Sequence, residues 1–138
     1  MSTRIEPYLF FHGRCEEALE FYRTALGAQI DMVMRYSDSP EPAPAGRLPA
    51  GFENKIMHAS FTINGARIMA SDGCEEDGTF GGFQLSLTYA TEAEAQPAFA
   101  ALAEGGNVHH PIGKTFWSPC FGMVQDKFGL GWMVTVEG

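Results

Sequence analysis

The chain has 138 residues, 45% of them hydrophobic, which is typical of one globular domain with a buried core. Its net charge of −8 disfavours binding to nucleic acids, because a phosphate backbone is held by clustered Lys and Arg. No apolar run reaches the length of a membrane span, and the N-terminal residues lack the apolar segment of a secretory signal.

The first three predicted elements are a strand, a helix and a second strand. Residues 5–12 are rich in aromatic side chains and predict a strand that ends at Gly13. A helix is expected from Cys15 to Leu26, since apolar residues recur there at helical spacing, and Gly27 is a natural stop. Residues 29–36 predict the second strand.

A long loop is expected at residues 37–54, because this stretch holds four of the chain's eight prolines. Loops of this length inside a domain are usually functional or contact a partner.

The remaining elements repeat the opening pattern. Residues 56–63 and 66–72 predict a hairpin around the turn Asn64-Gly65. After a glycine-rich linker, the chain shows a strand, a helix and three more strands, at residues 83–89, 92–104, 107–112, 120–126 and 131–136. The order β-α-β-β-β therefore occurs twice, in modules at about 4–73 and 82–138, and the fold class is α+β.

Strand alternation predicts one apolar and one mixed polar face in each module. The apolar faces, which should pack under the helices, carry Met57, Ala59, Phe61 and Ile63 in one module and Phe83, Leu85 and Leu87 in the other. The polar faces, which should line a ligand cleft, carry His58, Ser60 and Thr62, and Gln84, Ser86 and Thr88.

Three segments carry a resemblance to a known family. They are residues 8–27, beginning Tyr-Leu-Phe-Phe-His-Gly-Arg, residues 54–60, Asn-Lys-Ile-Met-His-Ala-Ser, and residues 121–132, beginning Phe-Gly-Met-Val-Gln-Asp-Lys-Phe-Gly. Together they resemble the PhnB-like branch of the glyoxalase/bleomycin-resistance/dioxygenase (vicinal-oxygen-chelate) superfamily. The resemblance implies two βαβββ modules that form an incomplete barrel, and a homodimer.

Members of this branch are often labelled 3-demethylubiquinone-9 3-methyltransferase-like. Enzymes that use S-adenosylmethionine usually have a glycine-rich turn after the first strand of a parallel sheet. The glycine pairs of this chain, Gly81-Gly82 and Gly105-Gly106, stand instead at a linker and at a helix stop. We therefore do not expect methyl transfer.

The resemblance also implies where a divalent metal would be bound, with one His, Gln or Glu on each of four strands. The corresponding positions here are Pro7, a residue within 69–71, Phe83 or Gln84, and Met133. Gln84 is the one reasonable donor among them, and a catalytic site needs about three protein ligands. We expect no metal site and no cofactor, with a divalent metal as the alternative.

His58 is the candidate catalytic residue, as a general base or ligand-orienting group on the polar face, although a structural histidine hydrogen-bonded in the cleft wall is the favoured alternative. Six further residues are expected to bind a ligand: Ser60, Ser71, Gln84, Ser86, Trp117 and Met133. Trp132 is interpreted as core or dimer packing.

Other polar residues are expected to have structural roles. His12 is interpreted as structural, and His109 and His110 as neighbours on opposite faces of an outer strand. Glu53, Lys55, Asp72 and Lys114 are expected to be solvated charges at strand ends.

The cysteines Cys15, Cys74 and Cys120 are odd in number and widely spaced, which disfavours a disulfide framework and a zinc motif and indicates reduced thiols in a cytoplasmic protein. A helix N-terminus could activate Cys15, but Glu16 and Glu17 oppose a thiolate there.

Two functions follow from these expectations. The first is a metal-independent small-molecule-binding protein like the bleomycin-resistance proteins, which fits the aromatic residues and the acidic charge. The second is a glyoxalase- or dioxygenase-like enzyme, in which His58 is the base and Ser60, Gln84 and Ser86 orient an oxygenated substrate.

Overall fold

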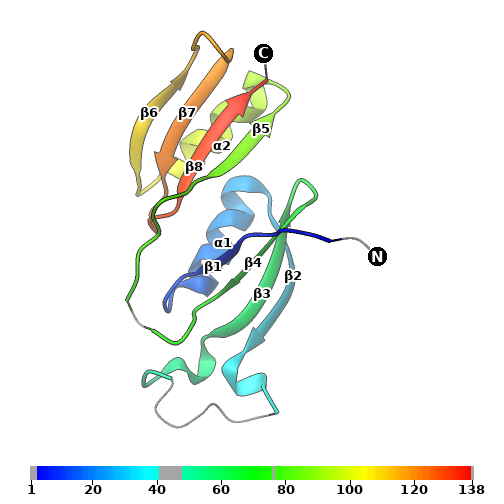
Figure 1. Ribbon diagram of the computed structural model, residues 1–138, viewed down its shortest axis with the longest axis vertical. Helices are drawn as coiled ribbons and strands as arrows, with labels where there is room; N and C mark the ends of the chain where they lie inside the picture. The colour runs from blue at the N-terminus through cyan, green and yellow to red at the C-terminus, as the bar shows by residue number, and fades with distance from the viewer. Residues whose placement is uncertain (1–2, 41–47, 76, 138) are drawn as a thin grey trace. The chain divides into compact units, whose positions relative to one another are not determined.

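The order β-α-β-β-β occurs twice along the chain, as the computed structural model shows for residues 3–40, 48–75 and 77–137 (Figure 1). The chain divides into two units, Met1–Gly78 and Thr79–Gly138, and the described residues of each form one α-helix and one four-stranded sheet. The predicted α+β class with two βαβββ modules is confirmed.

The first unit contains β1 (Tyr8–Phe10), α1 (Cys15–Leu26), β2 (Gln29–Arg35), β3 (Ile56–Ile63) and β4 (Ala66–Ser71). Its strand order is β1-β4-β3-β2; β1 runs parallel to β4, and the other pairs are antiparallel. β1 is shorter than predicted. The loop expected at residues 37–54 contains the short 3-10 helices Tyr36–Asp38 and Phe52–Asn54, and its residues 41–47 lie outside the described residues.

The helix α1 begins and ends as predicted. Its residues Cys15, Ala18, Leu19 and Tyr22 are buried at helical spacing, and Tyr22 stacks on Phe61 of β3 with 5.9 Å between ring centroids. Gly27 follows the helix in the left-handed conformation, with φ of 68°, which glycine adopts without strain.

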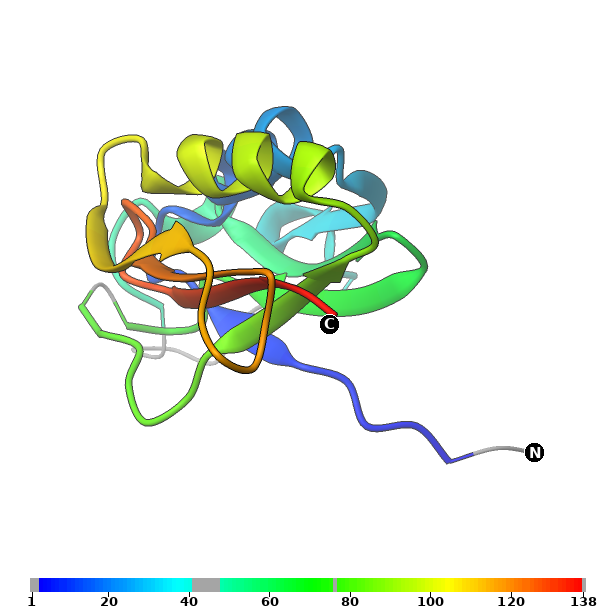
Figure 2. The ribbon, with the colours of Figure 1, turned by 90° about the horizontal axis from the view of Figure 1, so that it is seen from above.

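The second unit contains β5 (Leu85–Tyr89), α2 (Glu92–Ala103), β6 (Asn107–Gly113), β7 (Cys120–Gln125) and β8 (Gly131–Val136). Its strand order, β5-β8-β7-β6, repeats that of the first unit, with β5 parallel to β8. Figure 2 shows α2 lying along one face of this sheet, where Ala95, Phe99 and Leu102 are buried. Thr91 caps the helix by accepting a hydrogen bond from the Glu94 N–H.

Two expectations about the apolar faces are wrong. Phe83 lies before β5 and is 46% exposed, so it does not belong to the face under α2. In β3, a register shift between Met34 and Arg35 of β2 reverses the alternation at the start of the strand, so Ile56 is buried and Met57 is half-buried.

The helices of the described residues are too short or too polar to cross a membrane.

Candidate functional site

In the first unit, the sheet face opposite α1 carries three of the seven predicted site residues: His58, Ser60 and Ser71. The face toward the helix is fixed by the buried residues Leu9, Ala59 and Ala70, because side chains of a strand alternate between faces. The strand register then places the following side chains together on the other surface, which we call the first helix-free face: Tyr8, Phe10, Met32, Met34, His58, Ser60, Arg67, Met69 and Ser71.

The centre of this face is a hydrogen-bonded pair of rings. The Tyr8 Oη and His58 Nδ1 atoms lie 3.0 Å apart, and the two ring centroids are 5.6 Å apart. Phe10 continues the row, with its ring centroid 5.1 Å from that of Tyr8. Tyr8 is 38% exposed and Phe10 47% exposed, and His58 is half-buried. The predicted candidate His58 therefore stands among aromatic rings and has a polar partner.

Ser60 and Ser71 lie on the same face but beneath larger neighbours. They are 3% and 2% exposed, and the Ser71 hydroxyl accepts a hydrogen bond from the Gly73 N–H. In register, Ser60 stands between the side chains of Met32 and Met69, and Ser71 stands beside Phe10. Burial on this face is thus set by the rings and thioethers that surround each hydroxyl.

Tyr36 adds a second phenol at the end of β2. Its hydroxyl donates a hydrogen bond of 2.6 Å to the Gly73 carbonyl and lies 3.9 Å from the Cys74 Sγ. Burial raises the pKa of Tyr36 well above its usual range, and the contact with Cys74 and the charge of Asp72 act in the same direction. Tyr36 is therefore a neutral donor at all physiological pH values.

The expectation that Asp72 is a solvated charge is wrong. Asp72 is 1% exposed and accepts 2.8 Å hydrogen bonds from the backbone N–H groups of Gly13, Cys15 and Ile56. The carboxylate thereby joins the N-terminus of α1 to the start of β3, two residues before His58. Three backbone donors and the N-terminus of α1 take the place of water around this carboxylate.

The surroundings of Cys15 oppose a role as a nucleophile. It is fully buried, and this burial raises the pKa of the Cys15 thiol well above its usual range. The carboxylates of Asp72 and Glu16 raise the pKa further, which opposes the activation expected from a helix N-terminus.

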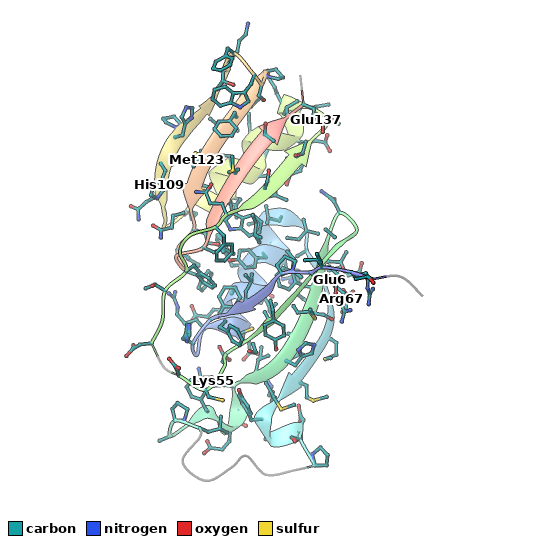
Figure 3. All side chains as sticks on the ribbon, viewed as in Figure 1. Glu6, Lys55, Arg67, His109, Met123 and Glu137 are labelled. Atoms are coloured by element: carbon teal, nitrogen blue, oxygen red, sulfur yellow. The ribbon has the colours of Figure 1, made fainter. Side chains whose placement is uncertain are left out.

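In the second unit, the face opposite α2 carries three of the predicted ligand-binding residues. Ser86 of β5 stands beside Met133 of β8, and Met133 stands beside Met123 of β7. Gln84 lies just before β5, and its side chain packs over Gly131, where an added Cβ would come within 2.9 Å of it. We call this surface the second helix-free face; Figure 3 labels Met123 on it.

Trp117 lies at the edge of that face, in a row of rings. Its ring centroid is 4.8 Å from that of Phe116 and 5.2 Å from that of Phe121, and the His110 ring centroid lies 5.4 Å from that of Phe121. Trp117 is 53% exposed, so its ring is accessible to a ligand that stacks on it. Trp132, in contrast, is 1% exposed and donates its indole N–H to Asp126. The interpretation of Trp132 as packing is confirmed for the core.

The donor atoms of the described residues do not fit the metal that the family resemblance implies. No three His, Cys, Asp or Glu side chains come together among residues 3–40, 48–75 and 77–137. At the implied positions, the Pro7 carbonyl accepts a hydrogen bond from the Met69 N–H, and Met133 offers a thioether, a poor ligand for a hard divalent ion.

Tyr8, Phe10 and Tyr36 are not among the site residues predicted from the sequence. For Tyr8 and Phe10 the signal was present, because they alternate with the apolar Leu9 on a strand that was correctly predicted. Tyr36 lies at the border of β2 and the proline-rich loop, where alternation ends and the sequence carries no such signal.

Comparison with known proteins shows which family the chain matches. A family model described as 3-demethylubiquinone-9 3-methyltransferase matches residues 3–135. Protein YjdN of Escherichia coli is 34% identical over 138 residues, which cover 96% of this chain and 94% of YjdN.

Solved structures give the same result. The crystal structure of protein PA1353 from Pseudomonas aeruginosa is 41% identical, with a TM-score of 0.86 and coverage of 99% of this chain and 98% of that one. A putative 3-demethylubiquinone-9 3-methyltransferase, PhnB protein, from Bacillus cereus is 30% identical, with a TM-score of 0.78 and coverage of 97% and 99%. A glyoxylase/bleomycin resistance protein/dioxygenase domain from Frankia, 12% identical with a TM-score of 0.66 over 100% of this chain and 99% of that one, shares the fold.

Proposed function

Since this chain belongs to the family described as 3-demethylubiquinone-9 3-methyltransferase, in the PhnB-like branch of the glyoxalase/bleomycin-resistance superfamily, we propose that it is a metal-independent small-molecule-binding protein. The observation that carries this proposal is the row of Tyr8, Phe10 and His58 on the first helix-free face. Partly exposed rings that surround one polar pair can stack on a ligand and orient it.

The donor chemistry of both faces supports binding without a metal. The first helix-free face offers phenol, imidazole, hydroxyl and thioether groups, and the second offers Ser86, Met123, Met133 and the rings around Trp117. These groups recognise apolar and hydrogen-bonding parts of an organic molecule. The net charge of −8 disfavours anionic ligands.

The family's printed name describes a methyl transfer, and the architecture of this chain argues against carrying that activity over. Each sheet has a single parallel strand pair, at one edge, and its other pairs are antiparallel. The glycine-rich turn after the first strand of a parallel α/β sheet, which would hold S-adenosylmethionine, has no counterpart at β1, which leads into α1 through His12 and Gly13.

Elemental analysis and thermal unfolding of the purified protein test the proposal. We expect substoichiometric Zn, Ni, Mn and Fe, and a higher melting temperature in the presence of phenol or tyramine than in the presence of benzoate. Phe10→Ala should abolish the rise, and Ile5→Ala should keep it, because Ile5 is 98% exposed. A stoichiometric metal, or a rise that survives Phe10→Ala, would contradict the proposal.

A second candidate function is an enzyme of the same superfamily, in which His58 acts as the base and Ser60, Gln84 and Ser86 orient an oxygenated substrate. The half-buried position of His58 on the polar face of β3 favours it. Turnover of an oxygenated substrate that disappears in His58→Gln would support the enzyme over the binding protein.

We also propose that the protein is a cytoplasmic homodimer that binds no nucleic acid. The three cysteines are unpaired, as in a reducing compartment, and the contacting rings of Phe116 and Trp117, which are 97% and 53% exposed, form an apolar patch that a second copy of the chain would cover. Light scattering that gives the mass of one chain at micromolar concentration would contradict the dimer.

A further inference from the structure

We propose that Tyr8 fixes the tautomer of His58, so that the His58 Nε2–H donates a hydrogen bond to a neutral, planar carbonyl compound lying on the Tyr8 and Phe10 rings. This inference rests on the proposed binding function and adds the chemical class of the ligand. It starts from the hydrogen bond of 3.0 Å between Tyr8 Oη and His58 Nδ1.

The direction of this hydrogen bond follows from the chemistry of its two groups. A phenol is a better donor than acceptor, and neutral histidine intrinsically prefers the proton on Nε2. Both preferences agree on one arrangement, in which the Tyr8 O–H donates to Nδ1. The neighbouring phenol of Tyr36 does not compete, since its own hydroxyl donates to the Gly73 carbonyl.

This arrangement makes His58 a donor. With Nδ1 accepting from Tyr8, the ring has no lone pair for a substrate proton, and its remaining polar group is Nε2–H. A carbonyl oxygen is the matching ligand group, because it accepts one hydrogen bond without carrying a charge. The pair thus favours a ligand-orienting role for His58 over the role of a general base.

The surroundings of the pair point to a neutral and flat ligand. Tyr8 and Phe10 expose rings 5.1 Å apart, which suit a planar molecule, and the Met69 thioether stands beside Tyr8 in register. Arg67, which the register places on this face, is ion-paired with Glu6 at 3.6 Å, so its charge is already partly compensated; Figure 3 shows the two side chains beside each other. Among the described residues of this face, Arg67 is the cation that a carboxylate or phosphate would meet, and Glu6 already pairs with it.

The experiment uses nitrogen-15 NMR of the full chain and titrations with acetophenone and ethylbenzene. The two probes have similar shapes, but acetophenone alone carries a carbonyl oxygen. We expect the Nε2–H tautomer of His58 in the parent protein, and about tenfold tighter binding of acetophenone than of ethylbenzene, as one hydrogen bond provides.

Two variants test the roles of the pair. His58→Phe keeps a ring and removes the donor, so acetophenone should bind about tenfold more weakly and ethylbenzene should be unaffected. Tyr8→Phe should produce a mixture of His58 tautomers and weaken acetophenone binding by about two- to fivefold. His109→Phe, at an exposed position of β6, is the matched control and should change neither quantity.

Each contrary result has a distinct meaning. A proton on Nδ1 of His58 in the parent protein, or equal affinities for the two probes, would overturn the inference and leave the proposed binding function intact. A parent protein that binds neither probe on the first helix-free face would overturn both. The affinities of the parent protein for acetophenone and ethylbenzene are compared without any variant, so this test remains decisive even if His58→Phe fails to fold.

Discussion

Replacement of the buried carboxylate by its amide, Asp72→Asn, is expected to destabilise the protein by about 2–5 kcal/mol. Asparagine has nearly the same shape, and its single oxygen can still accept from the Gly13 and Cys15 N–H groups, which both bond to the Oδ1 atom. Its NH2 group would then face the Ile56 N–H, which in the parent protein donates to Oδ2 over 2.8 Å. The NH2 group of the new side chain and the Ile56 N–H, both donors, would then face each other where the Ile56 N–H now donates to a carboxylate oxygen.

The expected loss in the free energy of unfolding has three parts. The buried Ile56 N–H loses its acceptor, at a cost of about 1–3 kcal/mol. The two remaining hydrogen bonds lose their charge assistance, which is about 1 kcal/mol in total. The N-terminus of α1 loses a neighbouring negative charge, which contributes about 0.3–1 kcal/mol.

Urea unfolding followed by far-ultraviolet circular dichroism measures the change. Asp31→Asn is the matched control, because Asp31 is exposed and accepts from the Thr62 hydroxyl at the surface; its effect should stay within about 0.5 kcal/mol. If Asp72→Asn is as stable as Asp31→Asn, the assignment of Asp72 as the junction between α1 and β3 is wrong.

Three further predictions concern packing and thiol chemistry. Gly106→Ala should destabilise the protein by about 1–3 kcal/mol in the same urea assay, because the added Cβ would collide with the Gln125 carbonyl oxygen at the end of β7. Gly113→Ala is the control and should be nearly neutral, because its added Cβ meets open space. Trp132→Phe should cost about 1–3 kcal/mol, since Asp126 loses the indole N–H; an unchanged unfolding midpoint would refute that contribution. Titration of the native protein with a thiol reagent should show one fast-reacting cysteine of three, lost in Cys74→Ser, because Cys74 alone is exposed and burial raises the pKa of the other two thiols.

The duplication was predictable because its signals are local. The helical stripe before Gly27 and the turn Asn64-Gly65, with φ of 48° and 87°, depend on residues next to each other in the sequence. The same holds for the face of His58, which follows from the alternation of β3.

What could not be predicted depends on contacts between distant segments. The three donors of Asp72 come from the loop before α1, from α1 itself and from β3, so the isolated residue looks like an ordinary surface charge. The partnership of Tyr8 with His58 spans 50 residues and exists because β1 pairs with β4 and β4 with β3. The reversed burial of Ile56 and Met57 arises from an irregular register with β2, which alternation alone does not reveal.

The strand order has a consequence for the way in which the protein is made. In each unit the first strand to leave the ribosome, β1 or β5, has as its neighbour the strand that is synthesised last, β4 or β8. Each late strand also lies inside its sheet, so the nascent sheet stays split until that strand arrives. A ribosome that stalls before Gly131 would therefore hold a second unit with an unpaired β5 and an exposed edge on β7, which is a ready substrate for chaperones and a risk for aggregation.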